Sequence, residues 1–516
     1  MDLSKFEAGL EAFDRELFDA TYPNLVGLSD KSSASEVFAR HAELFSKNAV
    51  REALKKVQAA GKGNSLEVMR SRFYLKAALE GLIGVKTAKL RDEVLKVAAT
   101  STVKVSGRKT PFRSVSLESE ANSAKRKKIS DACSPVHKKL SALELKALKS
   151  EYAAFKEFGF AYNSFYDLVK NVDHAALAKK LKYFLVASET QYNRELSKRL
   201  DAAKVKPKDA GSWDIAFLLK GREFDKFFPK NKALEVLHSS LEAMGLDLKA
   251  MENVSIDAVD RPKKRARAFV LCRSVPGEVF MVAKPFGGCN DYSVLLHESG
   301  HALHHAFTSP SLPYLARSAG GIERAPSDYA LTETYAFLFN NLRLNEQWVK
   351  EHFKMPHETT KAYMDFARFQ QLFYFRYLVA KLVYELKLHS NDLRVLNEYY
   401  EPTAKKHKNF AECYASILGQ ALKVKHSKDK YLLVDPGFYS ADYCRAFLAE
   451  AQLRRYLERN FGRDWFKQDR AGAFLKELWS RGNAMHVDEL MARLDYAQGL
   501  DFKVFARDFE RFGLRL

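Results

Sequence analysis

The chain has 516 residues, enough for several average domains or for one large body with two lobes. Its apolar fraction of 47% excludes wholesale disorder, and no run approaches the roughly 18 apolar residues that a membrane-spanning helix needs. The formal charge of +20 can attract nucleic acid or acidic partners, or it can be a solvated surface in which basic and acidic residues are mixed.

The N-terminal residues 1–18 alternate charged and apolar residues at helical spacing. They lack the basic start and the unbroken apolar stretch of a secretory signal. The five cysteines are scattered, odd in number and without a CxxC pair, which argues against a disulfide scaffold and against a cysteine-ligated metal. We therefore expect a cytoplasmic protein.

The first two hundred residues predict helices and one β-hairpin. Residues 101–117 alternate around a Ser-Gly turn, which is typical of a hairpin. The densest basic run, AKRKKIS at residues 124–130, is interpreted as the exposed start of a helix. Residues 141–169 and 174–200 carry apolar side chains at helical spacing. Because proline and glycine, which break helices, gather near Pro207, we expect one helical lobe over residues 1–206 and a second over residues 207–516.

Residues 265–285 predict two strands joined at residues 275–277, directly before a histidine-rich segment. Strand-like material is otherwise sparse, so the predicted fold class is mainly α with small β elements. The sequence contains neither a GxGxxG nor a GxxxxGK[ST] phosphate loop, and a nucleotide-driven enzyme is not expected.

The segment NDYSVLLHESGHALHHAF, residues 290–307, predicts a helix that Asn290 or Asp291 can cap and that ends by Pro310. His297 and His301 are four residues apart and project from one helix face, so their imidazoles can bind one metal ion. Glu298 follows the first histidine, completing an HExxH motif.

This motif has a chemical rationale. Neutral imidazole suits Zn²⁺, which lowers the pKa of a bound water from ~15.7 towards ~7. Glu298 can then accept the proton as the water attacks a carbonyl, and deliver it to the leaving amine. His304 and His305 are interpreted as structural residues or as supports of the ligands, because no glutamate follows His301.

A catalytic zinc usually takes three protein ligands and leaves one position for water. Two glutamates downstream are candidates for the third ligand. Glu333 falls within a predicted helix that reaches about residue 344, whereas Glu323 falls in a Gly-rich loop. Because a ligand must be held rigidly, Glu333 is favoured and Glu323 is the alternative.

The run RAFVLCRSVPGEVFMVAKPFGGCNDYSVLLHESGHALHHAF, followed by ALTETYAFLF, resembles the thimet oligopeptidase and oligoendopeptidase F family of zinc metallopeptidases. The resemblance implies that one Zn²⁺ is held by His297, His301 and Glu333, with Glu298 as the catalytic base. It also implies a mostly helical, two-lobed metallopeptidase fold around a deep substrate channel that admits short, unstructured peptides. Residues 207–516 would form the catalytic lobe.

A second segment, VDPGFYSADYCRAFLAEAQLRRYL at residues 434–457, is similar to a late Tyr-rich segment of that family. It implies that Tyr443, with Tyr439 one turn earlier, donates a hydrogen bond to the developing oxyanion. The family also pairs an edge strand with the substrate backbone, and residues 278–288 (EVFMVAKPFGG) occupy that place. A purely structural strand covering the zinc helix is the alternative.

The implied function is a zinc-dependent endopeptidase acting on short peptides, without nucleic-acid or membrane partners. A carboxypeptidase of related helical fold is an alternative, and it would need a basic group for the terminal carboxylate. Arg445, beside Tyr443, could be that group or a surface charge. A basic, non-enzymatic binding protein for nucleic acid or an acidic partner is a third reading, which predicts clustered positive charge and no bound metal.

Overall fold

The computed structural model describes residues 3–29, 33–63, 65–261, 263–265, 268–318, 328–393, 407–432 and 434–516. The chain forms two compact units, each assembled from three stretches of sequence. Unit 1 comprises Met1–Leu82, Arg222–Ala367 and Arg445–Phe505, and unit 2 comprises Ile83–Gly221, Arg368–Cys444 and Ala506–Leu516. The division expected between residues 206 and 207 stays a prediction.

Unit 1 consists of helices around one small sheet. Its strands are β3 (Val254–Asp257), β4 (Ala268–Ser274) and β5 (Glu278–Ala283). Its helices are α1 (Leu3–Leu25), α2 (Ala34–Arg40), α3 (Lys47–Ala60), α10 (Ala233–Glu242), α11 (Cys289–Phe307), α12 (Tyr314–Arg317), α13 (Ala330–Asn340), α14 (Glu346–Phe353), α19 (Asp469–Ser480), α20 (Val487–Arg493) and most of α21 (Phe502–Ala506).

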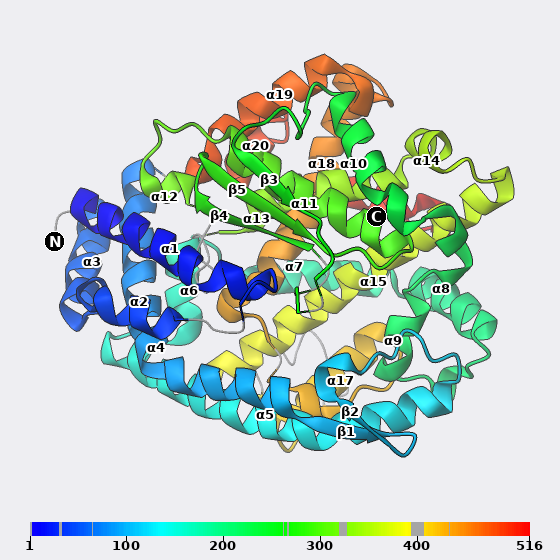
Figure 1. Cartoon of the computed structure of the whole chain (residues 1–516), viewed down its shortest axis with the longest axis horizontal. Helices are drawn as coiled ribbons and strands as arrows, with labels where there is room; N and C mark the ends of the chain where they lie inside the picture. Colours follow the sequence, from blue (N-terminus) through cyan, green and yellow to red (C-terminus); the bar gives the residue numbers. More distant parts are fainter. Residues whose placement is uncertain are drawn as a thin grey trace. The chain divides into compact units, whose positions relative to one another are not determined.

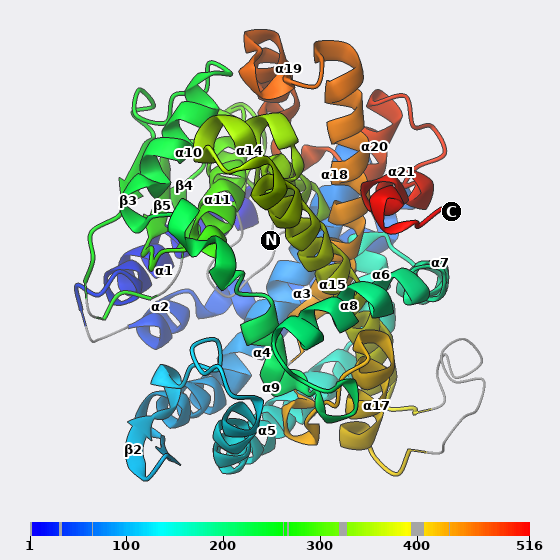
Figure 2. The same cartoon turned by 90° about the vertical axis from the view of Figure 1, so that its right-hand side faces the viewer.

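Unit 2 contains the hairpin of β1 (Thr102–Val105) and β2 (Arg108–Pro111), which was predicted from residues 101–117. Its helices are α5 (Ser123–Glu157), α6 (Tyr162–Lys170), α7 (His174–Ala187), α8 (Glu189–Ala202), α9 (Ser212–Leu218) and α17 (Phe410–Leu422). The hairpin packs beside α5 through a small apolar cluster that includes Val103, Cys133 and Val136 (Figure 2).

Three long helices contribute residues to both units. They are α4 (Leu66–Thr100), α15 (His357–Ser390) and α18 (Tyr439–Phe461). The expected fold class, mainly α with small β elements, is confirmed. No helix among the described residues is both long and apolar enough to span a membrane.

The sheet of unit 1 has the order β3-β5-β4, with β3 parallel and β4 antiparallel to β5. Alternation along β5 gives the sheet two apolar faces. Val279 and Met281 are buried in the core around α11, whereas Phe280 contacts the rings of Phe18 and Tyr22 in α1. Helix α1 therefore covers one face of the sheet and α11 the other (Figure 1).

The basic run at residues 124–130 forms the start of α5, as predicted, but it is not wholly exposed. Lys125, Lys127 and Lys128 are exposed, whereas Arg126 is buried and its Nε donates to Asp214 over 2.9 Å. The partner lies 88 residues away in sequence, so local composition could not reveal it.

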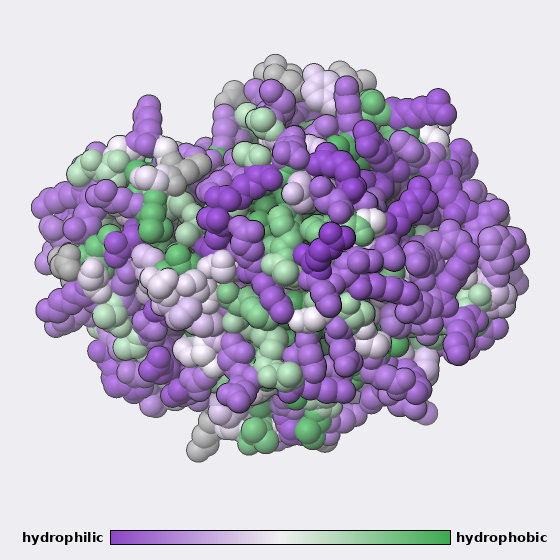
Figure 3. Space-filling model, turned by 90° about the horizontal axis from the view of Figure 1, so that it is seen from above, coloured by the Kyte–Doolittle hydropathy of each residue, from purple (hydrophilic) through white to green (hydrophobic). Residues whose placement is uncertain are grey.

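The face drawn in Figure 3 is largely hydrophilic, with smaller apolar patches between the hydrophilic areas.

Candidate metal centre

Helix α11 begins at Cys289, after Gly288 at the N-cap. The expected cap at Asn290 or Asp291 is wrong, because both residues lie inside the first turn. Asp291 is buried, and its carboxylate instead accepts hydrogen bonds from the backbone N–H groups of Phe286 and Gly287. The side chain thus fastens the loop between β5 and α11. The helix ends at Phe307, in agreement with the predicted stop before Pro310.

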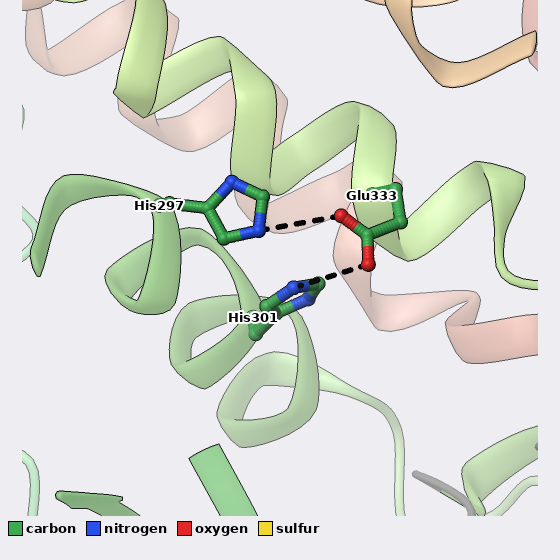
Figure 4. Close-up of side chains that lie close together, drawn as sticks. All are labelled: His297, His301 and Glu333. Atoms are coloured by element: carbon green, nitrogen blue, oxygen red, sulfur yellow. Dashed lines mark ion pairs between the residues drawn. The ribbon is translucent and has the colours of Figure 1, made fainter. Parts of the chain in front are cut away.

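The structure brings His297, His301 and Glu333 together, and their ligand atoms all lie within 4.8 Å of one another. Glu333 Oε2 is 3.3 Å from His297 Nε2, and Oε1 is 3.7 Å from His301 Nε2 (Figure 4). The Glu333 side chain is only 2% exposed. Two imidazole nitrogens facing one buried carboxylate form a donor set that suits Zn²⁺. The residues present therefore fit the metal that the sequence implied.

A close contact between two helices creates this arrangement. A Cβ atom built on Gly300 would lie 2.5 Å from the carbonyl oxygen of Tyr335 and 2.6 Å from Cα of Ala336. Only glycine lets the backbone of α13 pass this near to α11. Gly300 lies between Glu298 and His301 in α11. The close contact at Gly300 therefore holds α13 next to this part of α11 and brings Glu333 to both histidines. The sequence signal was a glycine inside a helix, which often marks a close backbone approach.

Two further residues of α13 contact the histidines. Thr332 Oγ1 lies 2.9 Å from Nδ1 of His301, so an Nδ1–H donor leaves the Nε2 lone pair directed towards Glu333. The ring of Phe337 lies 5.1 Å from that of His297 at 64°, an edge contact that limits rotation of the imidazole. Sequence reasoning assigned no role in the site to Thr332 or Phe337.

The two histidines have different electrostatic surroundings. Burial lowers the pKa of His297, but the hydrogen bond and charge of Glu333 and the charge of Glu298 outweigh it and raise the pKa overall. Burial lowers the pKa of His301 to about 4, which favours a neutral ring. A neutral imidazole keeps a lone pair for a cation.

Glu298 is half-buried beside the group. Burial raises the pKa of its carboxyl to about 7, although the charge of His297 and a hydrogen bond from the backbone N–H of Val270 act in the opposite direction. A carboxyl that titrates near neutral pH can both accept and return a proton. Val270 belongs to β4, so this strand reaches the proposed base.

The prediction that residues 278–288 supply an edge strand is wrong. Residues 278–283 form β5, and β5 is the central strand, paired with β3 on one side and β4 on the other. The four-residue strand β3 escaped sequence analysis because it is short and its parallel pairing joins residues 25 positions apart, as in Val254 and Val279. Within the described residues, β4 is the edge strand beside Glu298.

His304 and His305 do not belong to the group of three. Both are buried, and the ring of His304 lies 4.9 Å from that of Tyr335. Burial lowers the pKa of His304 to about 3 and that of His305 well below its usual value. Neutral rings packed between helices agree with the structural interpretation. Glu323, the alternative third ligand, lies outside the described residues.

Tyr439 and Tyr443 stand one turn apart at the start of α18, with ring centroids 4.5 Å from each other. Both are half-buried, whereas the intervening residues 440–442 are buried. The two phenols thus form the accessible face of this turn. They fall in unit 2 and the histidines in unit 1, and their part in the reaction stays a prediction.

Arg445, the candidate carboxylate-binding group, is buried. Its side chain is 4% exposed, and Nη1 donates to Asp328 over 2.8 Å. A guanidinium that already holds a buried carboxylate is poorly placed to bind the terminal carboxylate of a substrate.

No family model matches the chain, and no curated protein matches it. Solved structures do. The chain is similar to a candidate oligoendopeptidase F from Bacillus anthracis str. Ames, with a TM-score of 0.60, 14% identity, and coverage of 97% of this chain and 84% of that one. It is also similar to a candidate peptidase from Chlamydophila abortus, with a TM-score of 0.59, 13% identity, and coverage of 98% and 89%.

A third structure, PZ peptidase A with an inhibitor, gives a TM-score of 0.60 at 14% identity, with coverage of 96% of this chain and 85% of that chain. The three likenesses extend over nearly the whole chain. They show that the chain shares a mostly helical fold with these three proteins, whereas the deep channel that the sequence resemblance implied stays a prediction.

Proposed function

We propose that this chain is a zinc-dependent endopeptidase of the oligopeptidase type, which hydrolyses short, unstructured peptides. The observation that carries the proposal is the convergence of His297, His301 and Glu333, with Glu298 one residue from the first ligand. The fold shared with proteins described as peptidases supports it. Restriction to short peptides follows from the sequence resemblance, and the cytoplasmic location stays a prediction.

A zinc ion held by the three ligands would supply a Lewis acid that polarises the scissile carbonyl. It would also lower the pKa of water, so that the water loses a proton readily as it attacks the carbonyl. Glu298 would accept the proton of the attacking water and return it to the leaving amine. Burial raises the pKa of this carboxyl to about 7 in the metal-free chain, and the charge of a bound cation would lower it towards the base form. Thr332 would hold the ring of His301 in the ligand tautomer.

Tyr443, assisted by Tyr439, would donate a hydrogen bond to the oxygen on which negative charge develops. Support comes from the sequence resemblance and from the half-buried position of both phenols in the first turn of α18. The extended substrate would pair its backbone with the edge strand β4, beside Glu298.

The carboxypeptidase alternative loses its main support, because Arg445 is bonded to Asp328. The two modes are separable with peptides acetylated and amidated at their ends. An endopeptidase cleaves such peptides, whereas a carboxypeptidase needs the free terminal carboxylate.

The proposal is tested by measuring zinc in the purified protein and cleavage of a quenched fluorescent peptide before chelation, after chelation and after zinc is restored. We expect about one zinc per chain and activity that follows the metal. The same peptide sequence embedded in a folded protein should resist cleavage. A chain that binds nucleic acid in a salt-dependent manner, without zinc or hydrolysis, would replace this proposal with the binding-protein reading.

A further inference from the structure

Asp328 stabilises the start of the helix that carries the third candidate ligand. Helix α13 begins at Ala330, and the residue at its N-cap position, Tyr329, has helical backbone angles and makes no side-chain cap bond. Asp328, one residue further upstream, caps the helix instead, because its Oδ1 accepts a hydrogen bond from the backbone N–H of Ala330 over 2.9 Å. Glu333 lies in this same first turn.

The other carboxylate oxygen of Asp328 is held by two side chains from distant parts of unit 1. Arg445 Nη1 of α18 is 2.8 Å from Oδ2, and His486 Nε2 is 3.2 Å from it. His486 is itself the N-cap residue of α20. All three side chains are at most 10% exposed. Asp328 therefore ties the first turn of α13 to α18 and α20.

The cluster contains charged side chains of both signs. Burial lowers the pKa of His486, but hydrogen bonds to Asp328 and Asp488 raise it to about 9, so the ring is protonated at neutral pH. Asp488 approaches the other ring nitrogen at 3.1 Å. Asp328 thus lies against both Arg445 and His486, whose Nη2 and Nε2 atoms are themselves 3.2 Å apart.

Further contacts hold α13 along α18. The rings of Phe337 and Phe447 stack, and the Asn341 side-chain amide donates to Glu450 over 2.7 Å. Arg445, Phe447 and Glu450 thereby contact the turn before α13, its middle and the residue just after it. Among these contacts between α13 and α18, the ion pair of Asp328 and Arg445 is the one next to the first turn of α13, which contains Glu333.

We infer that the buried cluster of Asp328, Arg445 and His486 positions Glu333 for metal binding. Helix ends fray because their first N–H groups lack intrahelical partners, and a ligand in a first turn needs that turn to be fixed before the metal arrives. The described bonds of the three residues run to one another, to Asp488 and to the start of α13, so they are positioning residues. The inference rests on the proposed zinc function.

The test is the zinc affinity of Asp328→Asn, measured by competition with a fluorescent chelator. The asparagine oxygen can still accept the N–H of Ala330, but the charge that holds Arg445 and His486 is gone. We expect zinc to bind about 10- to 100-fold more weakly, as for other residues that support ligands without contacting the metal. Asp495→Asn is the matched control, because it removes an exposed ion pair with Arg459 of α18 and leaves the contacts of Asp328, Arg445 and His486 intact. Its affinity should stay within about twofold of wild type.

Circular dichroism and thermal unfolding show whether each variant folds. Should Asp328→Asn fail to fold, His486→Gln gives the answer, because it removes one cation and keeps the Arg445–Asp328 pair. Folded variants that bind zinc as tightly as wild type would overturn the positioning role. A wild-type chain without zinc affinity would instead overturn the proposed function. The absorption spectrum of a Co²⁺ probe supplies a second readout, since a displaced Glu333 alters the ligand field and a remote structural effect does not.

Discussion

Thr332 Oγ1 lies 2.9 Å from Nδ1 of His301, so a side chain next to the third candidate ligand fixes the ring of the second. Replacing Thr332 with valine keeps the shape and removes this hydrogen bond. We expect about 10- to 100-fold weaker zinc binding, measured by chelator competition. Thr334→Val is the control, because the Thr334 hydroxyl bonds only the carbonyl of Ala330 in its own helix among the bonds described. Equal affinities for the two variants would exclude a role for Thr332.

Glu298→Gln removes the proposed base and leaves the three ligands intact. We predict normal zinc content and a fall in kcat of about 10²- to 10⁴-fold, the usual contribution of a positioned acid–base group. Metal analysis and steady-state cleavage of a quenched peptide measure the two quantities. Exposed Glu477, changed to glutamine in parallel, should leave both unchanged. Full turnover by Glu298→Gln would mean that another group takes the proton.

Tyr443→Phe deletes one phenol hydroxyl at the start of α18. If this hydroxyl stabilises the oxyanion, kcat should fall about 10²- to 10³-fold while KM and zinc content change little. Tyr439→Phe should have a smaller effect. Tyr456 lies further along the same helix, where it stacks on Phe474, and its phenylalanine variant serves as the control. An unchanged kcat for Tyr443→Phe would remove this residue from the mechanism.

Gly300→Ala inserts a methyl group where α11 and α13 touch. The new Cβ would overlap the backbone at Tyr335 and Ala336, so α13 must move away. We expect a loss of about 1–3 kcal/mol in the free energy of unfolding, together with weaker zinc binding. Gly419 is a helical glycine whose added Cβ would meet only an ordinary contact at 3.4 Å, and Gly419→Ala should be tolerated. Chemical denaturation with and without zinc compares the two.

The ion pairs of His486 predict a pH dependence of stability. Its folded pKa of about 9 exceeds the usual 6.5 because Asp328 and Asp488 outweigh burial and the nearby charge of Arg445. A raised pKa stabilises the fold fully below about pH 6.5, and the contribution disappears as the pH rises through about 9. Other groups titrate in this range, so the comparison is with His486→Gln. The difference in unfolding free energy between the two proteins should shrink between pH 6.5 and 10, and a constant difference would contradict the protonated state.

Sequence patterns predicted the features that depend on residues close together in the chain. The hairpin at residues 101–117 follows from a two-residue turn, Ser106-Gly107, that suits a tight reversal. His297 and His301 share a helix face because they are four residues apart. Glu333 was favoured over Glu323 because it falls in a helix, and the structure brings it to both histidines.

Contacts between distant segments escaped prediction. The strand β5 was expected at an edge, but β3 pairs with it from an earlier part of the chain. The close approach at Gly300 and the bond between Asp328 and Arg445 depend on how helices pack, which no spacing in one segment encodes. A local contact was missed as well: Asn290 or Asp291 was expected to cap α11, whereas Asp291 lies in its first turn and bonds the preceding loop.

The interleaving of the two units constrains how the protein can be made. Since each unit draws on three separated stretches, no single cut in the chain releases both as intact pieces. During synthesis, unit 1 cannot be completed before Phe505 has emerged from the ribosome, and unit 2 needs Leu516. Neither unit is complete before its last stretch has been synthesised, and the apolar helices of the nascent chain are exposed to aggregation or chaperone capture throughout that interval.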